Sequence, residues 1–287
     1  MRARRIDQQF RAVMALLALS MLVALHRPAS AAPTLPRIAS TFTCTDQLLL
    51  RLADPEQIVG LSPFARDRSM SWLAGEAMNY RQLSGEAEDI LVLHPDIVVV
   101  GLYTRPETRQ LLKDKGFRVE EFDTGNSLDD AKAQIVRMAG LLGHPERAAP
   151  EIARLDAAIA RAREAVARKP YRVLFVSRRG WVAGANDMMS SLLATVGLVN
   201  AAAELGNPNG GYVPLETILM AKPDLLIVSD GGSRAEDQGK AFLLHPALEA
   251  LYPPDKRIVI PERLTVCGGP MLGEALDTLV SELKRVR

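Results

Sequence analysis

Glu88-Asp-Ile-Leu-Val-Leu-His-Pro-Asp-Ile-Val-Val-Val100 returns 128 residues later as Glu216-Thr-Ile-Leu-Met-Ala-Lys-Pro-Asp-Leu-Leu-Ile-Val228. The two stretches are identical at 6 of 13 positions, and five further positions pair one apolar residue with another. Each has the pattern of a helix end, a Pro-Asp turn and a continuous apolar strand, which is typical of a parallel sheet covered on both faces. The duplication therefore predicts two homologous α/β lobes.

The segments around each copy alternate between strand and helix patterns. We expect strands at 37–40, 57–61, 118–122, 172–177 and 257–260, and helices at 46–52, 105–115, 187–196, 242–251 and 271–286. This order favours parallel sheets with helices on their faces. We predict a signal peptide at 1–32, an N-terminal α/β lobe at 33–127, linking helices at 128–169 and a C-terminal α/β lobe at 170–287.

A long helix is expected to join these two Rossmann-like lobes, with a ligand cleft between them. Residues 146–169 are rich in Ala, Arg and Glu, which are strong helix formers, and the only internal proline, Pro150, falls in the first turn, where proline is tolerated. About 20 helical residues span roughly 30 Å, the width of a small lobe. A linker of this kind permits small rocking and resists wide closure.

The first 32 residues resemble an export signal of the Sec type. Arginines precede an apolar run at 12–25, and Ala29-Ser30-Ala31 offers small residues for cleavage near Ala31. Removing this segment takes away five Arg and one Asp, which changes the formal net charge from +1 to −3. Because no basic excess remains, nucleic acid is not an expected partner. We expect an exported protein.

Several motifs, taken in order, resemble the helical-backbone class (class III) of periplasmic substrate-binding proteins. They are the opening Arg37-Ile-Ala-Ser-Thr, the two Glu…Pro-Asp units, the inter-lobe helix and the strand Arg257-Ile-Val-Ile-Pro261. The resemblance covers roughly residues 36–285. It implies a monomeric receptor in the periplasm that captures a metal chelate, such as cobalamin or a ferric siderophore, and delivers it to an ABC permease, without catalysis and without a cofactor of its own.

The resemblance also implies that one glutamate per lobe docks onto arginines of the permease. Glu88 and Glu216 occupy the matching positions. A carboxylate accepts two hydrogen bonds from a guanidinium, so two such anchors can orient a symmetric partner. The alternative is that each glutamate only complements the dipole of its helix. We favour docking.

Ligand contacts are expected in the loops that follow strand ends, which face the crevice of open α/β sheets. Aromatic side chains there could stack on a planar ligand, and arginines could pair with its carboxylates. Loop 229–234 is a further part of this expected cleft, as are residues 41–45 and 102–105. The candidate cleft residues are Cys44, Phe64, Arg66, Trp72, Tyr80, Arg105, Arg178, Trp181, Tyr212, Arg263 and Cys267.

Cys44 and Cys267 allow three interpretations. They could be independent small residues, a disulfide that ties the lobes in an oxidising compartment, or thiols that contact a metal-bearing ligand. We favour the first.

The sequence positions of the histidines disfavour a metal site with histidine ligands. His94, His144 and His245 each precede a proline in a helix-end or turn context, so structural roles are expected and no metal site is predicted. An axial tyrosine stays open as a haem ligand.

Two other functions remain as alternatives. One is a haem- or metal-binding receptor or metallochaperone on the same scaffold. The other, which we favour least, is an exported α/β enzyme, since the chain has no Gly-x-Ser-x-Gly, Walker A or His-Glu-x-x-His motif.

Overall fold

The computed structural model describes residues 34–167, 170–206, 208–229 and 238–286. Leu35–Arg287 forms one compact unit. The predicted signal peptide lies outside the described residues, as do residues 230–234 of the predicted cleft loop. None of the helices in these ranges combines the length and the apolar composition that a membrane span requires.

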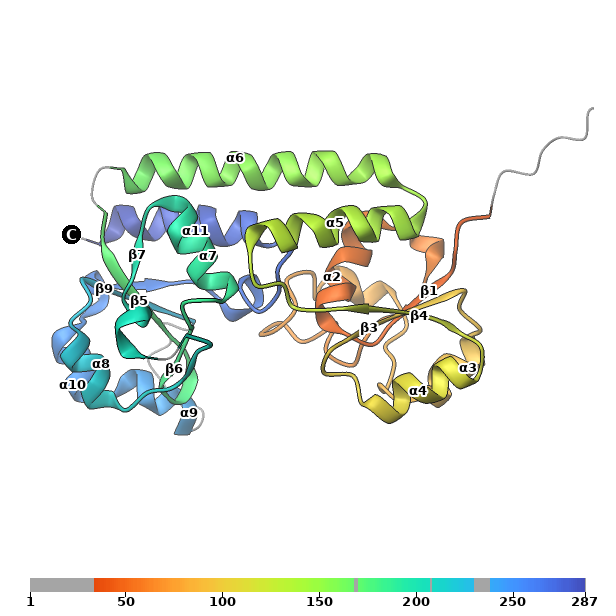
Figure 1. Cartoon of the computed structure of the whole chain (residues 1–287), viewed down its shortest axis with the longest axis horizontal. Helices are drawn as coiled ribbons and strands as arrows, with labels where there is room; N and C mark the ends of the chain where they lie inside the picture. Colours follow the sequence, from red (N-terminus) through yellow and green to blue (C-terminus); the bar gives the residue numbers. More distant parts are fainter. Residues whose placement is uncertain (1–33, 168–169, 207, 230–237, 287) are drawn as a thin grey trace, which may run out of the picture. The chain divides into compact units, whose positions relative to one another are not determined.

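The N-terminal sheet is parallel, in the order β2-β1-β3-β4. Figure 1 shows α2 and α5 on one side of its strands and α3 and α4 on the other. Along β3, Ile97 and Val99 pack with helices α2 and α5, whereas Val98 and Val100 pack with α3 and α4. Both faces are therefore covered, as the continuous apolar pattern predicted. The elements are β1 (Ile38–Ser40), α2 (Thr43–Leu52), β2 (Ile58–Gly60), α3 (Ala87–Leu93), β3 (Ile97–Gly101), α4 (Pro106–Asp114), β4 (Arg118–Phe122) and α5 (Leu128–Leu142).

The C-terminal sheet has the same two-sided burial. Phe175 of β5 faces the core under α7 and α11, and Leu174 faces the core under α8 and α10. The path is β10-β9-β5-β6-β8, with β7 also paired to β5. The elements are β5 (Arg172–Val176), β6 (Trp181–Val182), α7 (Met188–Val196), β7 (Val199–Asn200), β8 (Gly211–Tyr212), α8 (Leu215–Ala221), β9 (Leu225–Val228), α9 (Gln238–Ala241), α10 (Pro246–Leu251), β10 (Arg257–Val259) and α11 (Leu272–Arg285).

This sheet is mixed, which the prediction of parallel sheets did not anticipate. Strands β6 and β8 pair antiparallel with their neighbours. The cause is a tight turn after β5, in which Arg179 and Gly180 both have positive φ and the N–H of Ser177 donates to the carbonyl of Trp181. The chain reverses there and forms a short hairpin in place of a crossover.

The predicted helix at 242–251 is also interrupted. Residues Phe242–Leu244 form a single 3₁₀ turn, and His245 then accepts a hydrogen bond at Nδ1 from the N–H of Ala247 as the N-cap of α10. Pro246 occupies the first helical position, where its missing N–H costs nothing.

The duplicated units have the same hydrogen-bond arrangement in both lobes. The N–H of Arg37 donates to Asp96 Oδ2 at 2.7 Å, and the N–H of Arg172 donates to Asp224 Oδ2 at 2.8 Å. Each arginine side chain also donates to the carbonyl of the last residue of its duplicated helix, α3 or α8, and to that of the C-cap residue that follows it. The repeat in sequence is therefore a repeat in three-dimensional contacts.

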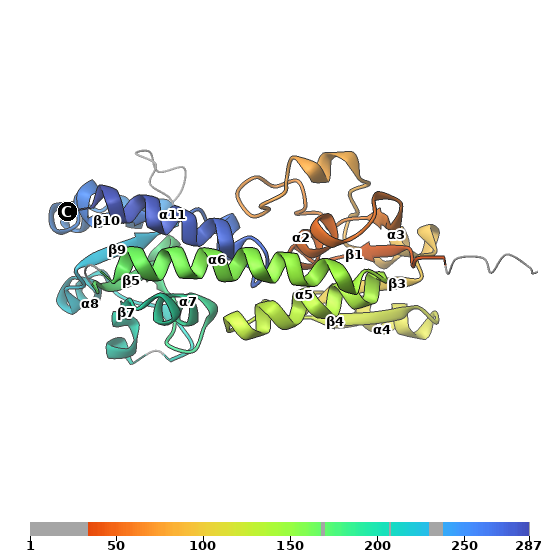
Figure 2. The same cartoon turned by 90° about the horizontal axis from the view of Figure 1, so that it is seen from above.

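Helix α6 (Ala148–Val166) carries the connection between the lobes and packs beside α5 and α11 (Figure 2). Its first residue, Ala148, belongs to the core beneath β1 and β3, whereas Leu155 and Ile159 belong to the core beneath β5 and β9. That second core also includes Cys44 of α2 and Leu128 of α5. Because one helix and one core serve both lobes, their relative motion is restricted.

Candidate ligand-binding site

A cavity of about 470 Å³ is lined by residues from both lobes. Its N-terminal side consists of Tyr103, in the turn after β3, and Thr124–Asn126, in the loop after β4. The C-terminal side is larger and consists of Phe175, Ser177, Trp181, Ala183, Asp187, Met188, Met189, Asn209, Glu262, Thr265 and Val266. We refer to this space as the interlobe cavity. Its size falls within the range of small-molecule sites.

A second cavity of about 460 Å³ shares Tyr103 with the first. The other lining residues all belong to the N-terminal lobe and include Phe42, Phe64, Met70 and Arg105. We call it the N-lobe cavity. Because one side chain lines both, a ligand larger than either cavity could occupy the two together.

Tyr103 is the most prominent side chain of the site. It is 81% exposed, and its ring lies 6.4 Å from that of Phe42 in a tilted arrangement. Two hydrogen bonds between Gly101 and Thr104 hold the turn that presents it. An exposed aromatic ring on a fixed turn is suited to stacking on a planar ligand.

Asp187 supplies an unsatisfied acceptor at the interlobe cavity. Its Oδ1 accepts from the N–H of Ser190 at 3.0 Å and so caps α7. Its Oδ2 is buried and has no hydrogen-bond partner among the described residues, and burial raises the pKa of this carboxyl above its usual value. A buried orphan acceptor is costly unless something donates to it, so a ligand N–H, O–H or cationic group fits here.

Apolar lining residues can adapt to a bulky ligand. Met188 and Met189 stand side by side at the start of α7, and Trp181 and Val266 complete an apolar surface around them. Unbranched thioether side chains fill irregular spaces and tolerate different shapes.

The two lobes touch directly beside the interlobe cavity. The N–H of Gly268 donates to the carbonyl of Thr124 at 2.6 Å. A Cβ at Gly268 would lie 2.8 Å from that carbonyl oxygen and 2.6 Å from Met188 Cε, so only glycine allows this approach. Asp123 Oδ1 fixes the opposing loop by accepting from the N–H of Gly125 and from Gln134 Nε2.

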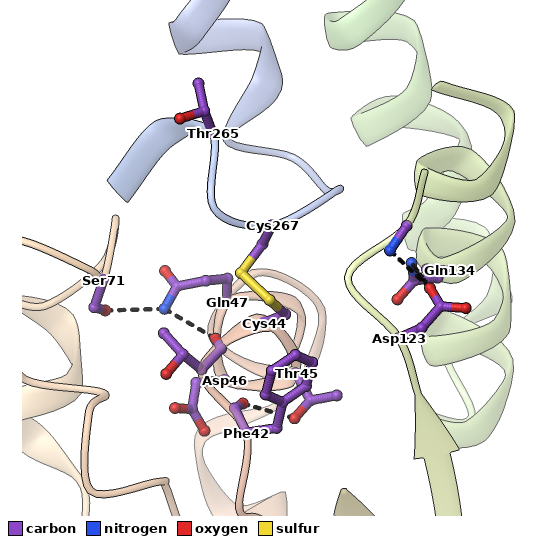
Figure 3. Close-up of a disulfide and its surroundings, with 12 residues drawn as sticks. Phe42, Cys44, Thr45, Asp46, Gln47, Ser71, Asp123, Gln134, Thr265 and Cys267 are labelled. Carbon is purple, nitrogen blue, oxygen red and sulfur yellow. Dashed lines mark hydrogen bonds between the residues drawn. A yellow bond between two sulfur atoms is a disulfide. The ribbon is translucent and has the colours of Figure 1, made fainter. Parts of the chain in front are cut away.

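Cys44 and Cys267 form a disulfide between the lobes, with a Cα–Cα distance of 5.3 Å. Figure 3 shows Cys267 in the segment before α11 meeting Cys44 at the start of α2. The preferred interpretation of two independent small residues is therefore wrong, and so is that of free thiols facing a ligand. Both cysteines are buried, while their neighbours Thr43 and Val266 line the N-lobe and interlobe cavities respectively.

Asp46 lies on the same helix as Cys44 and is fully buried. Its Oδ2 accepts from Ser62 Oγ at 2.5 Å and its Oδ1 from the N–H of Ser62 at 3.1 Å. Burial raises the pKa of Asp46 to about 7, against the opposing effect of hydrogen bonds from Ser40 and Ser62. Gln47, the next residue, donates to Ser71 Oγ and accepts from the N–H of Leu73. These bonds fix the irregular segment that contributes Phe64 and Met70 to the N-lobe cavity.

Three sequence-predicted cleft residues line the interlobe or the N-lobe cavity. Trp181 lines the interlobe cavity, and Phe64 and Arg105 line the N-lobe cavity. Arg105 is already paired with Glu86 at 3.0 Å, and this pair is largely exposed. A surface pair of this kind is weak, so it leaves the guanidinium able to exchange partners.

Three others lie in packing positions elsewhere in the N-terminal lobe. Arg66 donates to the carbonyls of Ala77 and Tyr80, which fixes the segment between them. Tyr80 packs against the N-terminal core, and burial raises its pKa. Trp72 donates from Nε1 to Glu274 at 2.6 Å and lines a third cavity, next to α6 and α11.

The remaining predicted residues do not line the interlobe or the N-lobe cavity. Tyr212 is exposed on β8 opposite Trp181, Arg178 is exposed in the turn after β5, and Arg263 is half-buried in the turn Glu262–Leu264. Of the predicted loop at 229–234, only Ser229 belongs to the described residues.

Glu88 and Glu216 occupy equivalent and exposed positions. Each lies in the first turn of its duplicated helix, α3 or α8. In each lobe this helix covers the sheet face opposite the one covered by α5 or α6 (Figure 1).

The histidines occupy structural positions. His94 ends α3 in the left-handed conformation, and His144 contacts Asp54 at 3.0 Å through Nε2 and Glu146 through Nδ1. His245 caps α10, as described above. Within the described residues, no three His, Cys, Asp or Glu side chains form a group that could hold a metal ion.

Sequence reasoning missed several lining residues. Loops after strand ends face the crevice, and Thr124–Asn126 lie just after the strand predicted at 118–122. These residues were not among the candidates, although their position after a strand was the signal that could have found them. An Asp directly before an apolar helix, as Asp187 is, indicates an N-cap. The neighbouring sequence does not indicate that its second carboxylate oxygen is buried without a hydrogen-bond partner.

Both the sequence and the fold of this chain are similar to those of known periplasmic binding proteins. The sequence model of a family described as periplasmic binding protein matches residues 38–252. The heme-binding protein RhuT from Roseiflexus sp. RS-1 is 26% identical, with a TM-score of 0.70 over 87% of this chain and 98% of that chain. The heme-binding protein BhuT, in complex with two hemes, is 24% identical, with a TM-score of 0.69 over 86% and 97%. The vitamin B12 binding protein BtuF of Vibrio cholerae is 18% identical, with a TM-score of 0.65 over 86% and 96%. Among curated proteins, none matches the sequence significantly.

Proposed function

Because the chain belongs to the periplasmic binding protein family, we propose that it is an exported receptor that holds a metal chelate between its lobes and delivers it to an ABC permease. The observation that carries this proposal is the interlobe cavity, which takes its lining from the loops after β3 and β4 on one side and from the C-terminal lobe on the other. A ligand bound there contacts both lobes at once.

The lining suits a large, partly apolar ligand. Tyr103 and Trp181 offer aromatic surfaces, Met188 and Met189 offer adaptable apolar ones, and the N-lobe cavity extends the space beyond Tyr103. RhuT and BhuT are heme-binding proteins and BtuF is a vitamin B12 binding protein, so haem and corrinoids are chelates to test. Ferric siderophores, which the resemblance in sequence implies, are the third class to test.

Charge in the interlobe cavity favours some of these chelates over others. Asp187 and Glu262 contribute carboxylates, and no Arg, Lys or His occurs among the described lining residues. A ligand rich in carboxylates would be repelled there, whereas amide N–H groups or a positive charge would satisfy Asp187. We therefore favour a corrinoid or a neutral or cationic ferric chelate.

Delivery depends on recognition by the membrane partner. We assign permease docking to Glu88 and Glu216, whose exposed carboxylates occupy matching places on the two lobes. A monomer presents one pair of such anchors to a permease with two like halves. We infer periplasmic location and no turnover of the ligand, in keeping with the binding function of the family.

A binding screen tests the proposal. Purified mature chain is mixed with cyanocobalamin, haemin or ferric desferrioxamine, and binding is followed by thermal shift and Trp fluorescence. We expect at least one chelate to bind and to be recovered chemically unchanged. Tyr103→Ala should weaken binding, whereas Tyr212→Ala, which alters another exposed tyrosine, should not. Absence of binding to every chelate, or conversion of one of them, would contradict the proposal.

A further inference from the structure

We propose that each docking surface combines its glutamate with an exposed apolar side chain, Val92 beside Glu88 on α3 and Met220 beside Glu216 on α8, and that the permease contacts both members of each pair. This inference rests on the proposed function, since it takes the permease as the partner.

The two apolar side chains are unusually exposed. Val92 is 71% exposed and Met220 is 79% exposed, and among the large apolar side chains of the described residues only Tyr103, which lines both cavities, exceeds these values. Scattered apolar residues on a surface need no explanation. Here, however, the two occupy the same place in a duplicated unit, at the constant offset of 128 residues.

Each apolar residue lies on the same helical face as its glutamate. Val92 follows Glu88 by four residues, and Met220 follows Glu216 by four, so each pair is separated by about one helical turn. The fold does not use Val92 or Met220 for packing, because Ile90 and Ile218, both fully buried, attach the two helices to their sheets. The carboxylate and the apolar group thus form one small surface per lobe.

Both surfaces are fixed in position before any partner arrives. Arg37 and Arg172 bind the last carbonyls of α3 and α8, and both helices end in a left-handed residue, His94 or Lys222. A rigid surface loses little conformational freedom on binding, which favours recognition.

The composition of each surface indicates the partner. An acid beside an apolar side chain complements a basic residue beside an apolar pocket, and a buried apolar contact typically contributes more affinity than an exposed ion pair. Two matched surfaces on one chain require a partner that presents this combination twice. A permease built from two like halves meets that requirement.

Site-specific photocrosslinking in the native host tests the inference. A photoreactive amino acid replaces Val92 or Met220 in the full chain, and matched controls replace Val136 and Met78, which are exposed residues of the same types on other surfaces. Further variants carry the photoreactive group at Glu88 or Glu216, and crosslinked proteins are identified by mass spectrometry.

We expect the Val92 and Met220 positions to crosslink to the same permease and the controls to give at least tenfold less product. Crosslinking from the glutamate positions alone would overturn the apolar contacts and leave permease docking intact. Crosslinking to a second copy of the chain would overturn the assignment of the partner. If none of the four positions captures a permease, the proposed delivery function itself fails.

Discussion

Cys44 and Cys267 are bonded to each other although 223 residues separate them in sequence, and this bond joins the start of α2 in one lobe to the segment before α11 in the other. Two further connections accompany it. Helix α6 contributes to the cores of both lobes, and the N–H of Gly268 donates to the carbonyl of Thr124. The lobes are thus tied at three places, which favours a receptor with little opening and closing.

Replacing both cysteines with serine should destabilise the oxidised protein by about 4 kcal/mol, because the unfolded chain regains the freedom of a very long loop. The measurement is urea unfolding followed by circular dichroism. We also expect faster hydrogen exchange at Thr124–Asn126, since one of the three ties is lost.

The single variants Cys44→Ser and Cys267→Ser provide the control. If the bond is responsible, either single variant should lose as much stability as the double variant, because each breaks the same link. Effects that add between the two single variants would show that the cysteines act independently.

Asp46 should make stability depend on pH. Its folded-state pKa is about 7, against an ordinary value of 3.8, so the folded protein binds a proton more tightly than the unfolded chain. Its contribution to the free energy of unfolding therefore falls as pH rises from about 4 to 7. The fall is about 4 kcal/mol, which corresponds to the full difference between the folded and unfolded pKa values of Asp46. Asp46→Asn removes this dependence.

The test compares the two proteins by urea unfolding at pH 4.5 and pH 8. The asparagine variant should gain in stability relative to the wild type at the higher pH, while still accepting from the N–H of Ser62. A difference between the two proteins that stays constant over this range would contradict the assigned titration.

Asp187→Asn should weaken ligand binding by about tenfold or more, because a charged acceptor contributes more than a neutral one. Asparagine can still cap α7 through its Oδ1, so thermal stability should change little. In the wild type, affinity should fall as pH drops through the raised pKa of Asp187, and the variant should lack that fall. Equal affinity and equal pH dependence in titrations with the chelate found by the screen would remove Asp187 from the site.

Replacing Glu88 and Glu216 together with alanine should abolish uptake of the chelate by cells and leave its affinity for the purified protein unchanged. Both side chains are exposed and line neither cavity. Uptake of the radiolabelled chelate and equilibrium titration are the two measurements. Loss of affinity in the double variant would place these residues in the ligand site.

The duplicated units were predictable from sequence because local chemistry determines them. Pro95-Asp96 and Pro223-Asp224 each end a helix and start a strand, and each aspartate accepts a hydrogen bond from the backbone N–H of Arg37 or Arg172, at the start of the neighbouring strand β1 or β5. The apolar runs that follow are long enough to show burial on both faces.

Features that depend on tertiary context were not predictable. The antiparallel strands β6 and β8 depend on the left-handed turn at Arg179-Gly180, and the sequence Gly180-Trp-Val-Ala-Gly184 gives little strand signal. The cysteine pairing depends on how α2 and the segment before α11 meet, which sequence separation does not reveal. For the same reason, the position of Trp181 after a strand end correctly predicted that it lines the cavity, whereas the contact of Trp72 with α11 could not be predicted from its local sequence.

Hydrogen exchange with and without the bound chelate tests most directly whether the ligand lies between the lobes. We predict simultaneous protection of Thr124–Asn126 in one lobe and Asp187–Met189 in the other, because both segments line the interlobe cavity. Protection confined to one lobe, or protection only around the third cavity beside α6 and α11, would contradict it.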